Sequence, residues 1–442
     1  MSQPQDDADT TTVFLHWAQQ RLGLDAVDPR TPLTALGLDS VKAAELLTIL
    51  EDRFGVELSA EDIYGGMCVA DLVTAVTEHG APGGHPVPAA PLLRPAGAGL
   101  DFGLFFFASD AQHADAQRYQ LLFDSARFAD AHGFSSIWLP ERHFHKFGGL
   151  YPNPAVLGAA LAAITRRVRI RAGSVVLPLH NPVRVAEDWS VVDNLSDGRV
   201  DVAFATGWNP DDFVLAPHDY VTRVEATRSG METVRRLWRG ASVTLPNGVG
   251  EPRPVRIFPT PIQPELATWV TCSGGVERFE MAGELGANVL TALLFQSVDE
   301  LADKITAFRK ARARHGHDAD AGKVTVMLHT FVGADEAAVR DTVRGPFRSY
   351  LADSVDLWRR GAESLDALDD RSRNKVLDFA FERYYRTNGL FGTPESALSM
   401  VESLRQAGAG EIASLIDFGV AAPTVLDGLE SLAALAGKAR SL

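Results

Sequence analysis

Eight short apolar segments, which alternate with helical stretches over residues 100–442, constrain the fold most strongly. The segments are DFGLFFF at 101, SSIWL at 135, VRIRAGSVVL at 168, RVDVAFATG at 199, TWVTC at 268, GANVLTALL at 286, VTVMLHTFV at 324 and EIASLIDFG at 411. Strands this apolar are typical of a parallel sheet that helices cover on its faces. Eight of them favour a closed α/β barrel of the (β/α)8 TIM type, and an open parallel sheet is the alternative.

A segment rich in Pro, Gly and Ala divides the chain. Residues 81–99 read APGGHPVPAAPLLRPAGAG, a composition that forms no core and is typical of a semi-extended linker. We therefore expect one domain over residues 1–80 and the barrel over residues 100–442. Apolar residues at helical spacing between Val41 and Phe54, with apolar stretches before and after them, indicate that the first domain is a small all-α bundle.

Ser40 stands at the start of a predicted helix, in the run LGLDSVKAAEL. A serine here would cap the helix, and a helix N-terminus also attracts a phosphate ester. Residues 10–80 resemble the acyl and peptidyl carrier domains of polyketide and non-ribosomal peptide synthases. The resemblance implies a four-helix fold for this domain. It also implies that a phosphopantetheinyl transferase attaches 4′-phosphopantetheine to Ser40, and that acyl-loading or synthase modules are partners.

Composition excludes several classes of function. The net charge of −15 is unsuited to a nucleic-acid binder, and no run of eighteen apolar residues suggests a membrane span. Cys68 and Cys272 lie far apart, which indicates two reduced thiols rather than a disulfide framework. The N-terminal sequence is acidic and polar, unlike a signal peptide. We expect a cytoplasmic protein without nucleic-acid or membrane partners.

The exit of the second strand, LPERHFHKFGG, concentrates ionisable side chains. Glu141, Arg142, His143 and His145 fall within five positions, interleaved with aromatic residues. Catalytic groups of a (β/α)8 barrel lie at such exits, and several ionisable groups together indicate an active site better than one histidine does. His143 and His145 also have the spacing of a metal pair. The fifth and sixth exits offer no further histidine and Asp417 alone is not enough, so we expect no metal.

Other strand exits fit a flat, phosphorylated cofactor. The exit of the fifth strand is a Ser-Gly-Gly loop before a helix, which suits a phosphate. The exit of the fourth strand, Thr-Gly-Trp, offers a hydroxyl, a glycine that lets the cofactor approach the backbone closely, and a flat aromatic ring. A serine on the third strand adds to them. The residues are Ser174, Thr206, Gly207, Trp208, Ser273, Gly274 and Gly275. We find no convincing GxGxxG fingerprint of a nucleotide-binding fold.

Three motifs carry a resemblance to a known family. WLPERHFHKFGGLYPNP, GSVVLPLHNPVRVAEDWSVVDNLSDGRVDVAFATGW and LIDFG resemble the luciferase-like flavin monooxygenases, especially those associated with peptide and polyketide synthases, over about residues 101–437. The resemblance implies a barrel of the bacterial luciferase kind and a homo-oligomer. It also implies reduced FMN from a separate flavin reductase, which with O2 gives a 4a-peroxide that oxygenates the substrate.

The resemblance also suggests roles for individual residues. It places Gly173, Ser174 and Val175 at the isoalloxazine ring, beside a non-proline cis peptide, Ser273 at the flavin phosphate, and Thr206, Gly207 and Trp208 at the phosphate side or the ring. Bacterial luciferase has two consecutive histidines after the glutamate that matches Glu141, and the first is catalytic. Here Arg142 takes that place and only His143 is retained. Arg142 is a candidate for stabilising negative charge, and His143 or His145 for proton transfer.

A carrier domain joined to an oxygenase predicts the oxidation of a tethered thioester. Our leading hypothesis is hydroxylation of an acyl or aminoacyl group on the carrier, with Baeyer–Villiger insertion and oxidative decarboxylation as variants. The linker would raise the local concentration of substrate, although a carrier acting in trans is also open. Two alternatives differ in kind: hydride transfer with a deazaflavin coenzyme, and a catalytically idle barrel that only docks the carrier.

Overall fold

The computed structural model describes residues 28, 30, 31, 67–71, 99–107, 118–217, 219–294, 296–353 and 370–441. The predicted helical bundle over 1–80, its attachment residue Ser40 and the linker at 81–99 lie almost wholly outside these residues. The chain divides into two compact units, one of Met1–Pro91 with Phe347–Thr387 and one of Leu92–Pro346 with Asn388–Leu442. All eight predicted strands belong to the second unit, which is the unit that carries the candidate site.

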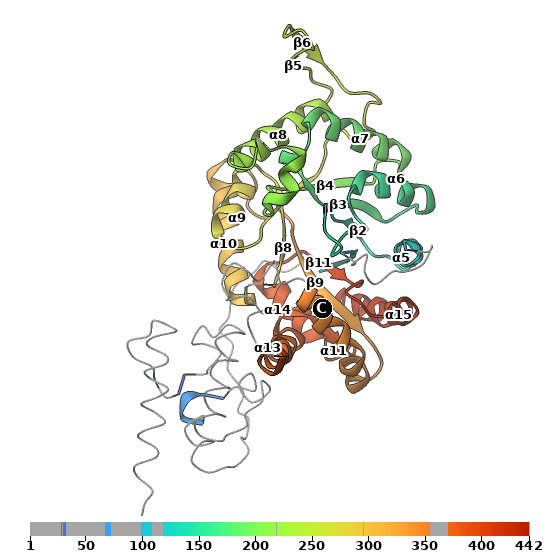
Figure 1. The fold of residues 1–442 in the computed structure, drawn as a ribbon, viewed down its shortest axis with the longest axis vertical. Coiled ribbons are helices and arrows are strands. Elements are labelled where there is room, and N and C mark those ends of the chain that lie inside the picture. The colour runs from blue at the N-terminus through green and yellow to red at the C-terminus, as the bar shows by residue number, and fades with distance from the viewer. Residues whose placement is uncertain are drawn as a thin grey trace, which may run out of the picture. The chain divides into compact units, whose positions relative to one another are not determined.

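Eight parallel strands close into a barrel (Figure 1). They are β1 (Asp101–Phe105), β2 (Ser136–Leu139), β3 (Arg169–Val176), β4 (Val200–Ala205), β7 (Thr268–Thr271), β8 (Asn288–Ala292), β9 (Val324–Val332) and β11 (Glu411–Leu415). Strand β11 pairs with both β1 and β9, and β9 pairs with β8, so the sheet has no open edge in this ring. The closed barrel is confirmed, and each strand falls in one of the eight apolar segments.

Helices follow the strands and form a ring outside them (Figure 1). They are α5 (Gln120–Ala131), α6 (Pro154–Ile164), α7 (Pro182–Leu195), α8 (Arg223–Trp238), α9 (Val276–Glu284), α10 (Val298–Arg314), α14 (Leu398–Ala407) and α15 (Ala422–Ala439). Two of them begin with an Asn-Pro pair, in which the asparagine side chain accepts from the first backbone N–H groups and proline fixes the first turn. None of the helices in the described ranges is long and apolar enough to cross a bilayer.

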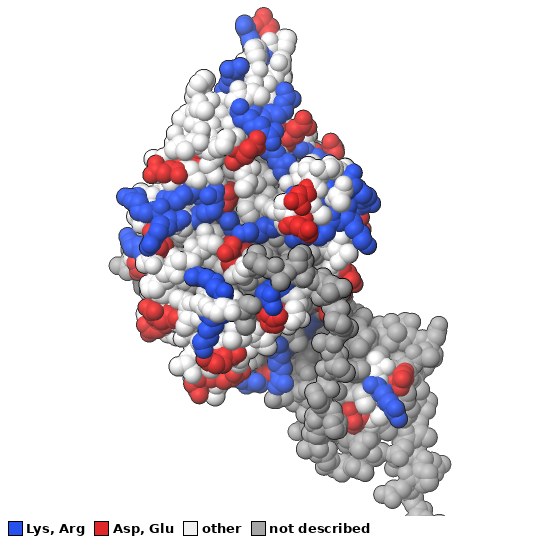
Figure 2. Space-filling view, turned by 180° about the vertical axis from the view of Figure 1, so that it is seen from behind, with Lys and Arg blue, Asp and Glu red and all other residues white. Residues whose placement is uncertain are grey.

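Several elements lie outside the barrel pattern. A hairpin of β5 (Val243–Pro246) and β6 (Pro252–Val255) projects from the second unit (Figure 1), and β10 (Leu390–Gly392) pairs with β9. Between β9 and β10 the structure has α11 (Glu336–Asp353), α13 (Asp370–Arg383) and a π-helical turn at Tyr384–Asn388. On the face shown in Figure 2, many basic side chains lie in a band across the described barrel, with smaller groups of acidic side chains among and below them.

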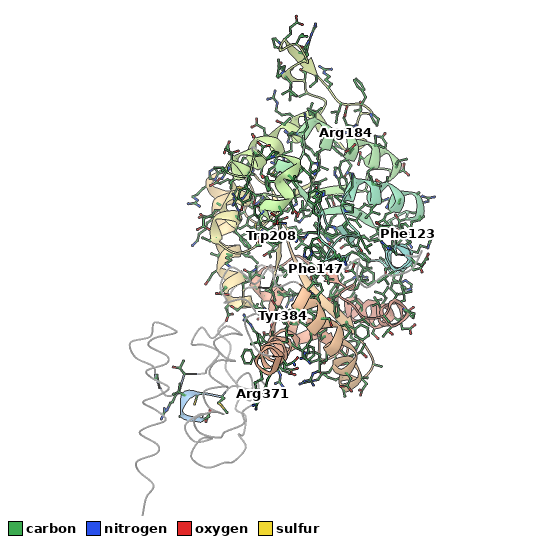
Figure 3. The ribbon with its side chains drawn as sticks, in the orientation of Figure 1. Phe123, Phe147, Arg184, Trp208, Arg371 and Tyr384 are labelled. Carbon is green, nitrogen blue, oxygen red and sulfur yellow. The ribbon has the colours of Figure 1, made fainter. Side chains whose placement is uncertain are left out.

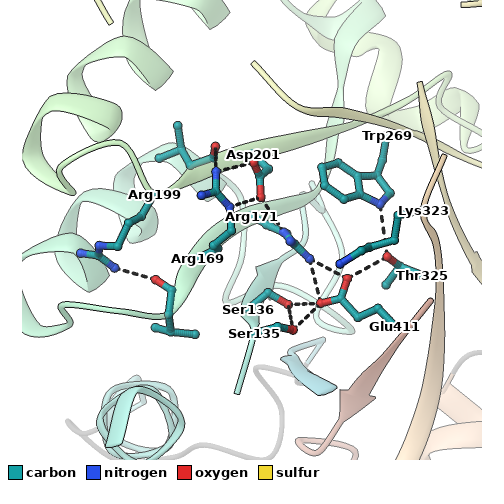
Figure 4. Close-up of polar contacts among 12 residues, drawn as sticks. Ser135, Ser136, Arg169, Arg171, Arg199, Asp201, Trp269, Lys323, Thr325 and Glu411 are labelled. Atoms are coloured by element: carbon teal, nitrogen blue, oxygen red, sulfur yellow. Dashed lines mark hydrogen bonds and ion pairs between the residues drawn. The ribbon is translucent and has the colours of Figure 1, made fainter. Parts of the chain in front are cut away.

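A buried ion-pair network fills the barrel near the N-terminal ends of its strands (Figure 4). Arg171 donates to Asp201 at 2.7 Å and to both carboxylate oxygens of Glu411 at 2.6 and 2.8 Å. Its guanidinium lies 4.9 Å and 4.7 Å from the ring centroids of Trp138 and Trp269. Every charge in this network has a partner, and the network lies at the end of the barrel opposite the strand exits that carry the candidate site.

We expect Glu411→Ala to lower the free energy of unfolding of the barrel by about 3–5 kcal/mol, because the buried Arg171 would then share Asp201 with Arg169 and its charge would no longer be balanced. Burial alone would raise the pKa of Glu411, but Arg171 and Lys323 hold it below the ordinary value. The stabilisation is therefore present above the ordinary pKa and is lost as the pH falls through the lower, folded value. Denaturant titration of the variant measures the loss.

Glu402→Ala is the matched control, because Glu402 pairs with Arg405 at 2.8 Å on the half-exposed face of α14. Such a pair contributes at most about 1 kcal/mol. Equal losses in the two variants would show that the buried network is not a main source of the barrel's stability.

Candidate functional site

Glu141 joins the exits of β2 and β3 at the C-terminal end of the barrel. One of its carboxylate oxygens accepts from Nε2 of His143 at 2.7 Å and from Nε2 of His180 at 2.6 Å. The other accepts from the backbone N–H of Val176 at 2.7 Å. The Glu141 side chain is 1% exposed, so the three donors replace the water it loses.

The two histidines keep this buried carboxylate charged. Burial alone would raise the pKa of Glu141, but the hydrogen bonds from His143 and His180 hold it below the ordinary value. Burial alone would lower the pKa of His180, and Glu141 raises it above the ordinary value instead. Glu141 and His180 therefore each favour the charged form of the other. Because Nε2 of His143 is bound to Glu141, Nδ1 is the ring atom of His143 that can exchange a proton with a substrate.

His143 and His145, which have the spacing of a metal pair in the sequence, have different hydrogen-bond partners in the structure. The side chain of His145 is exposed, and its Nδ1 accepts from the backbone N–H of Phe147 at 3.1 Å. Within the described residues, the group of His, Cys, Asp and Glu whose ligand atoms come within 4.8 Å of one another is Glu141, His143 and His180. In the structure these three are joined directly by hydrogen bonds, in the geometry of a proton-holding network.

Arg142 links the exits of β2 and β4. Its side chain is 6% exposed, and its guanidinium lies 3.7 Å from a carboxylate oxygen of Asp212 and 4.8 Å from the ring centroid of Trp208. Burial raises the pKa of Asp212, while Arg142 lowers it. Trp208 and Phe147 both lie inside the ring of helices (Figure 3). Arg142 is thus a positive charge that Asp212 and the Trp208 ring hold in place.

Gly173 and Ser174, in the C-terminal half of β3, are buried and closely packed. The Gly173–Ser174 peptide bond is cis, as the family resemblance led us to expect. A Cβ at Gly173 would lie 2.9 Å from the Phe105 ring and 3.0 Å from the Trp138 ring, so only glycine fits. Across the barrel mouth, the hydroxyls of Ser174 and Thr271 lie 2.5 Å apart, which joins the exits of β3 and β7.

At position 207, in the β4 exit, steric contacts again require glycine. Its φ is +75°, and a Cβ would lie 2.7 Å from the Phe213 ring and 3.0 Å from Val176. Arg223 donates to the carbonyl of Gly207 at 3.2 Å and to that of Tyr220 at 2.7 Å. The loop of Thr206 and Trp208 is therefore held closely against η4 (Pro210–Leu215) and the start of α8.

The β7 exit has the features of an anion site. Ser273, Gly274 and Gly275 are exposed, and no side chain caps α9, whose N-cap is Gly275. Arg278 lies in the first turn of α9. Burial lowers the pKa of Arg278, and the nearby Arg223 and Arg228 lower it further. An anion at this helix N-terminus would relieve the repulsion among the arginines.

Sequence reasoning missed part of this site. It noted Glu141 without assigning it a role, and it did not select His180, Thr271, Arg223 or Arg278. His180 follows the third strand in LPLHNP, so the rule that used the other strand exits would have found it. The missed arginines lie on helices, where sequence alone does not show which loop they face.

A closed parallel barrel with charged and aromatic groups at its C-terminal mouth is the architecture of a barrel enzyme. The chain belongs to the luciferase-like monooxygenase family, whose model matches residues 100–411. A second model, the phosphopantetheine attachment site, matches residues 17–76. The family, the enzyme class and the presence of a carrier-type domain, all expected from the sequence, are thus confirmed.

Individual relatives agree with this assignment. The chain is 24% identical over 319 residues to the oxygenase component of flavin-dependent trigonelline monooxygenase from Acinetobacter baylyi, covering 70% of this chain and 86% of that protein. Its fold is similar to that of monooxygenase RslO1 from Streptomyces bottropensis, with a TM-score of 0.64, 23% identity, and coverage of 76% and 98%. It is also similar to the oxygenating constituent of 3,6-diketocamphane monooxygenase from Pseudomonas putida in complex with FMN, with a TM-score of 0.62, 18% identity, and coverage of 77% and 98%.

Proposed function

We propose that the chain is the oxygenase component of a two-component flavin monooxygenase that oxygenates a carrier-bound thioester. It takes reduced FMN from a separate reductase, and its substrate is an acyl or aminoacyl group on 4′-phosphopantetheine. The observation that carries the proposal is the presence of both a monooxygenase barrel and a phosphopantetheine attachment domain in one chain. The domain limits 1–80, 81–99 and 100–442 and the homo-oligomeric state stay predictions.

The barrel mouth fits FMN. The phosphate would lie at Ser273, Gly274 and Gly275, where uncapped backbone N–H groups and Arg278 supply positive charge. The ring would lie at Gly173, Ser174 and Val175 of β3, with Thr206, Gly207 and Trp208 on the β4 side. Named flavin monooxygenases among the relatives, one of them solved with FMN, support this choice of cofactor. When bound, reduced FMN supplies the electrons that activate O2.

The side chains of the β2 exit would control charge and protons. Arg142, fixed by Asp212 and Trp208, would stabilise negative charge that develops at the reacting oxygen. His143 would give or accept a proton at Nδ1, because Glu141 orients the ring through Nε2. Glu141 and His180 would act as positioning residues. His145 is exposed, so its predicted catalytic role has weaker support than that of His143.

Oxygen-18 labelling tests the proposed function. Full-length protein is modified on its carrier domain, loaded with a panel of acyl and aminoacyl groups, and supplied with reduced FMN under oxygen-18 gas. We expect one oxygen-18 atom in one of the acyl chains, found by mass spectrometry after thioester release. Oxidation without label, supported by an oxidised deazaflavin that accepts a hydride from the substrate, would instead identify hydride transfer. No conversion and no flavin binding would support the idle docking platform.

We expect Arg278→Ala to weaken FMN binding by about tenfold, or about 1.4 kcal/mol, because a charge-assisted contact to the phosphate is lost. Quenching of flavin fluorescence measures the affinity. Riboflavin, which has no phosphate, should bind wild type and variant equally. Arg314→Ala is the control, since Arg314 is exposed on α10 and pairs with Glu280. Equal weakening of FMN and riboflavin would show that Arg278 does not contact the phosphate.

A further inference from the structure

The loop after β2 forms a cavity that the proposed flavin site does not use. The cavity has a volume of about 370 Å³ and is lined by Arg142, His143, Phe144, His145, Lys146, Gly149 and Pro152. None of these side chains is acidic, and four are basic or become so on protonation. The proposed flavin phosphate lies at the β7 exit, and β3 and β4 stand between that exit and this one in the sheet. The cavity is therefore a separate cationic region of the mouth.

The tip of this loop presents an aromatic ring and a cation to solvent. Phe144 is 65% exposed, and its φ of +54° lies in the left-handed region that a bulky side chain rarely adopts. Hydrogen bonds hold the turn: the N–H of Gly149 donates to the carbonyl of Lys146, and that of Phe147 donates to Nδ1 of His145, both at 3.1 Å. Because Nδ1 accepts, the neutral His145 ring carries its proton on Nε2 as a donor. The exposed ring of Phe144 and the exposed side chain of Lys146 are therefore both accessible to a ligand at this turn.

The rest of the sequence indicates the charge of that ligand. Residues 1–80 contain 14 acidic and 4 basic side chains, which is −10 of the total formal charge of −15. A phosphopantetheine arm adds a phosphodiester, followed by a pantoyl group with two methyls. Such an arm, borne on an acidic domain, is complementary to a cationic cavity with an aromatic rim.

We propose that this cavity binds the phosphate and pantoyl part of 4′-phosphopantetheine, with Lys146 and His145 at the phosphate and Phe144 against the pantoyl methyls. The inference rests on the proposed function, in which the substrate is carried on this arm. The buried Arg142 and the half-buried His143 line the inner part of the cavity, so an arm held at its rim would direct the thioester toward the reacting groups.

A pair of analogues that differ only in the phosphate tests the proposal by binding alone. Unmodified full-length protein is titrated calorimetrically with an S-alkyl phosphopantetheine and with the matching S-alkyl pantetheine. We expect the phosphate to tighten binding about tenfold at low salt, and the preference to shrink as the ionic strength rises. Lys146→Ala should remove most of the preference and Lys146→Arg should keep it, while Lys310→Ala, at an exposed position on α10, should change neither affinity.

Equal affinity for the two analogues in the wild type, binding of neither, or an unchanged phosphate preference in Lys146→Ala would overturn the proposal. These outcomes do not depend on turnover. If oxygen-18 is incorporated but the phosphate gives no preference, the oxygenase function is supported and the binding site is rejected. If the phosphate gives a clear preference but no oxygen-18 is incorporated, the binding site is supported and the oxygenase function is rejected.

Discussion

Replacing Ser40 with alanine will abolish oxygenation of the chain's own tethered substrate. Without the hydroxyl no phosphodiester can form, so no thioester is attached and the expected loss is complete rather than partial. The tether also matters quantitatively, since a short flexible link corresponds to an effective concentration on the order of millimolar. Intact-protein mass spectrometry after treatment with a phosphopantetheinyl transferase and an acyl-coenzyme A measures the loading, and product release measures the reaction.

Ser59→Ala is the matched control, because Ser59 belongs to the same predicted domain but not to the LGLDS run. It should be modified and should turn over like the wild type. Free acyl-phosphopantetheine at high concentration should restore product formation in Ser40→Ala, since the barrel is unchanged. Modification that persists in Ser40→Ala would place the attachment site elsewhere. If Ser40→Ala oxygenates a substrate on a separate carrier as fast as the wild type does, the carrier acts in trans.

The barrel could be predicted from the sequence because each of its strands is buried on both faces. Such strands are continuous apolar runs, and the Asn-Pro pairs at 153–154 and 181–182 mark where α6 and α7 begin. The hairpin of β5 and β6 could not be predicted in this way. Most of its residues are exposed, as at Leu245, and both of its strands contain proline, so they carry neither an apolar run nor an alternation.

The candidate site, too, could be predicted from the sequence only in part. Glu141, Arg142 and His143 are adjacent in sequence, and their local density indicated an active site. The contacts that give them geometry come from elsewhere, as when Glu141 accepts from His180, 39 residues away in sequence. The contact between Ser174 and Thr271 joins two strands that lie on either side of β4, so it depends on how the sheet curves there. Composition and spacing identify the groups, whereas the three-dimensional arrangement of the strands decides which groups meet.

Glu141→Gln is expected to lower kcat by about 10²–10³ while changing the affinity for FMN less than twofold. The effect is in the range of losing an oriented proton-transfer group. Glutamine has nearly the same size and can still accept from the N–H of Val176, but it removes the negative charge that His143 and His180 face. The His143 ring would lose its orientation and His180 its counter-charge. Single-turnover product formation, with oxygen-18 as the label, measures the chemical step.

The pH profile separates this positioning role from a merely structural one. Glu141 holds the pKa of His180 above its ordinary value, so the pair stays charged until the pH rises through that higher value. Glu141→Gln removes the negative charge that raises the pKa of His180, while the burial that lowers this pKa remains. His180 should therefore lose its proton at a lower pH, and the alkaline limb of the pH profile should shift to lower pH. Glu141→Asp keeps the negative charge, so the pKa of His180 should stay raised in that variant. Glu187→Gln, on the more exposed part of α7, should change neither the rate nor the pH profile. A fall in kcat with an unmoved profile would mean that Glu141 supports the fold of the mouth rather than the charge state of its histidines.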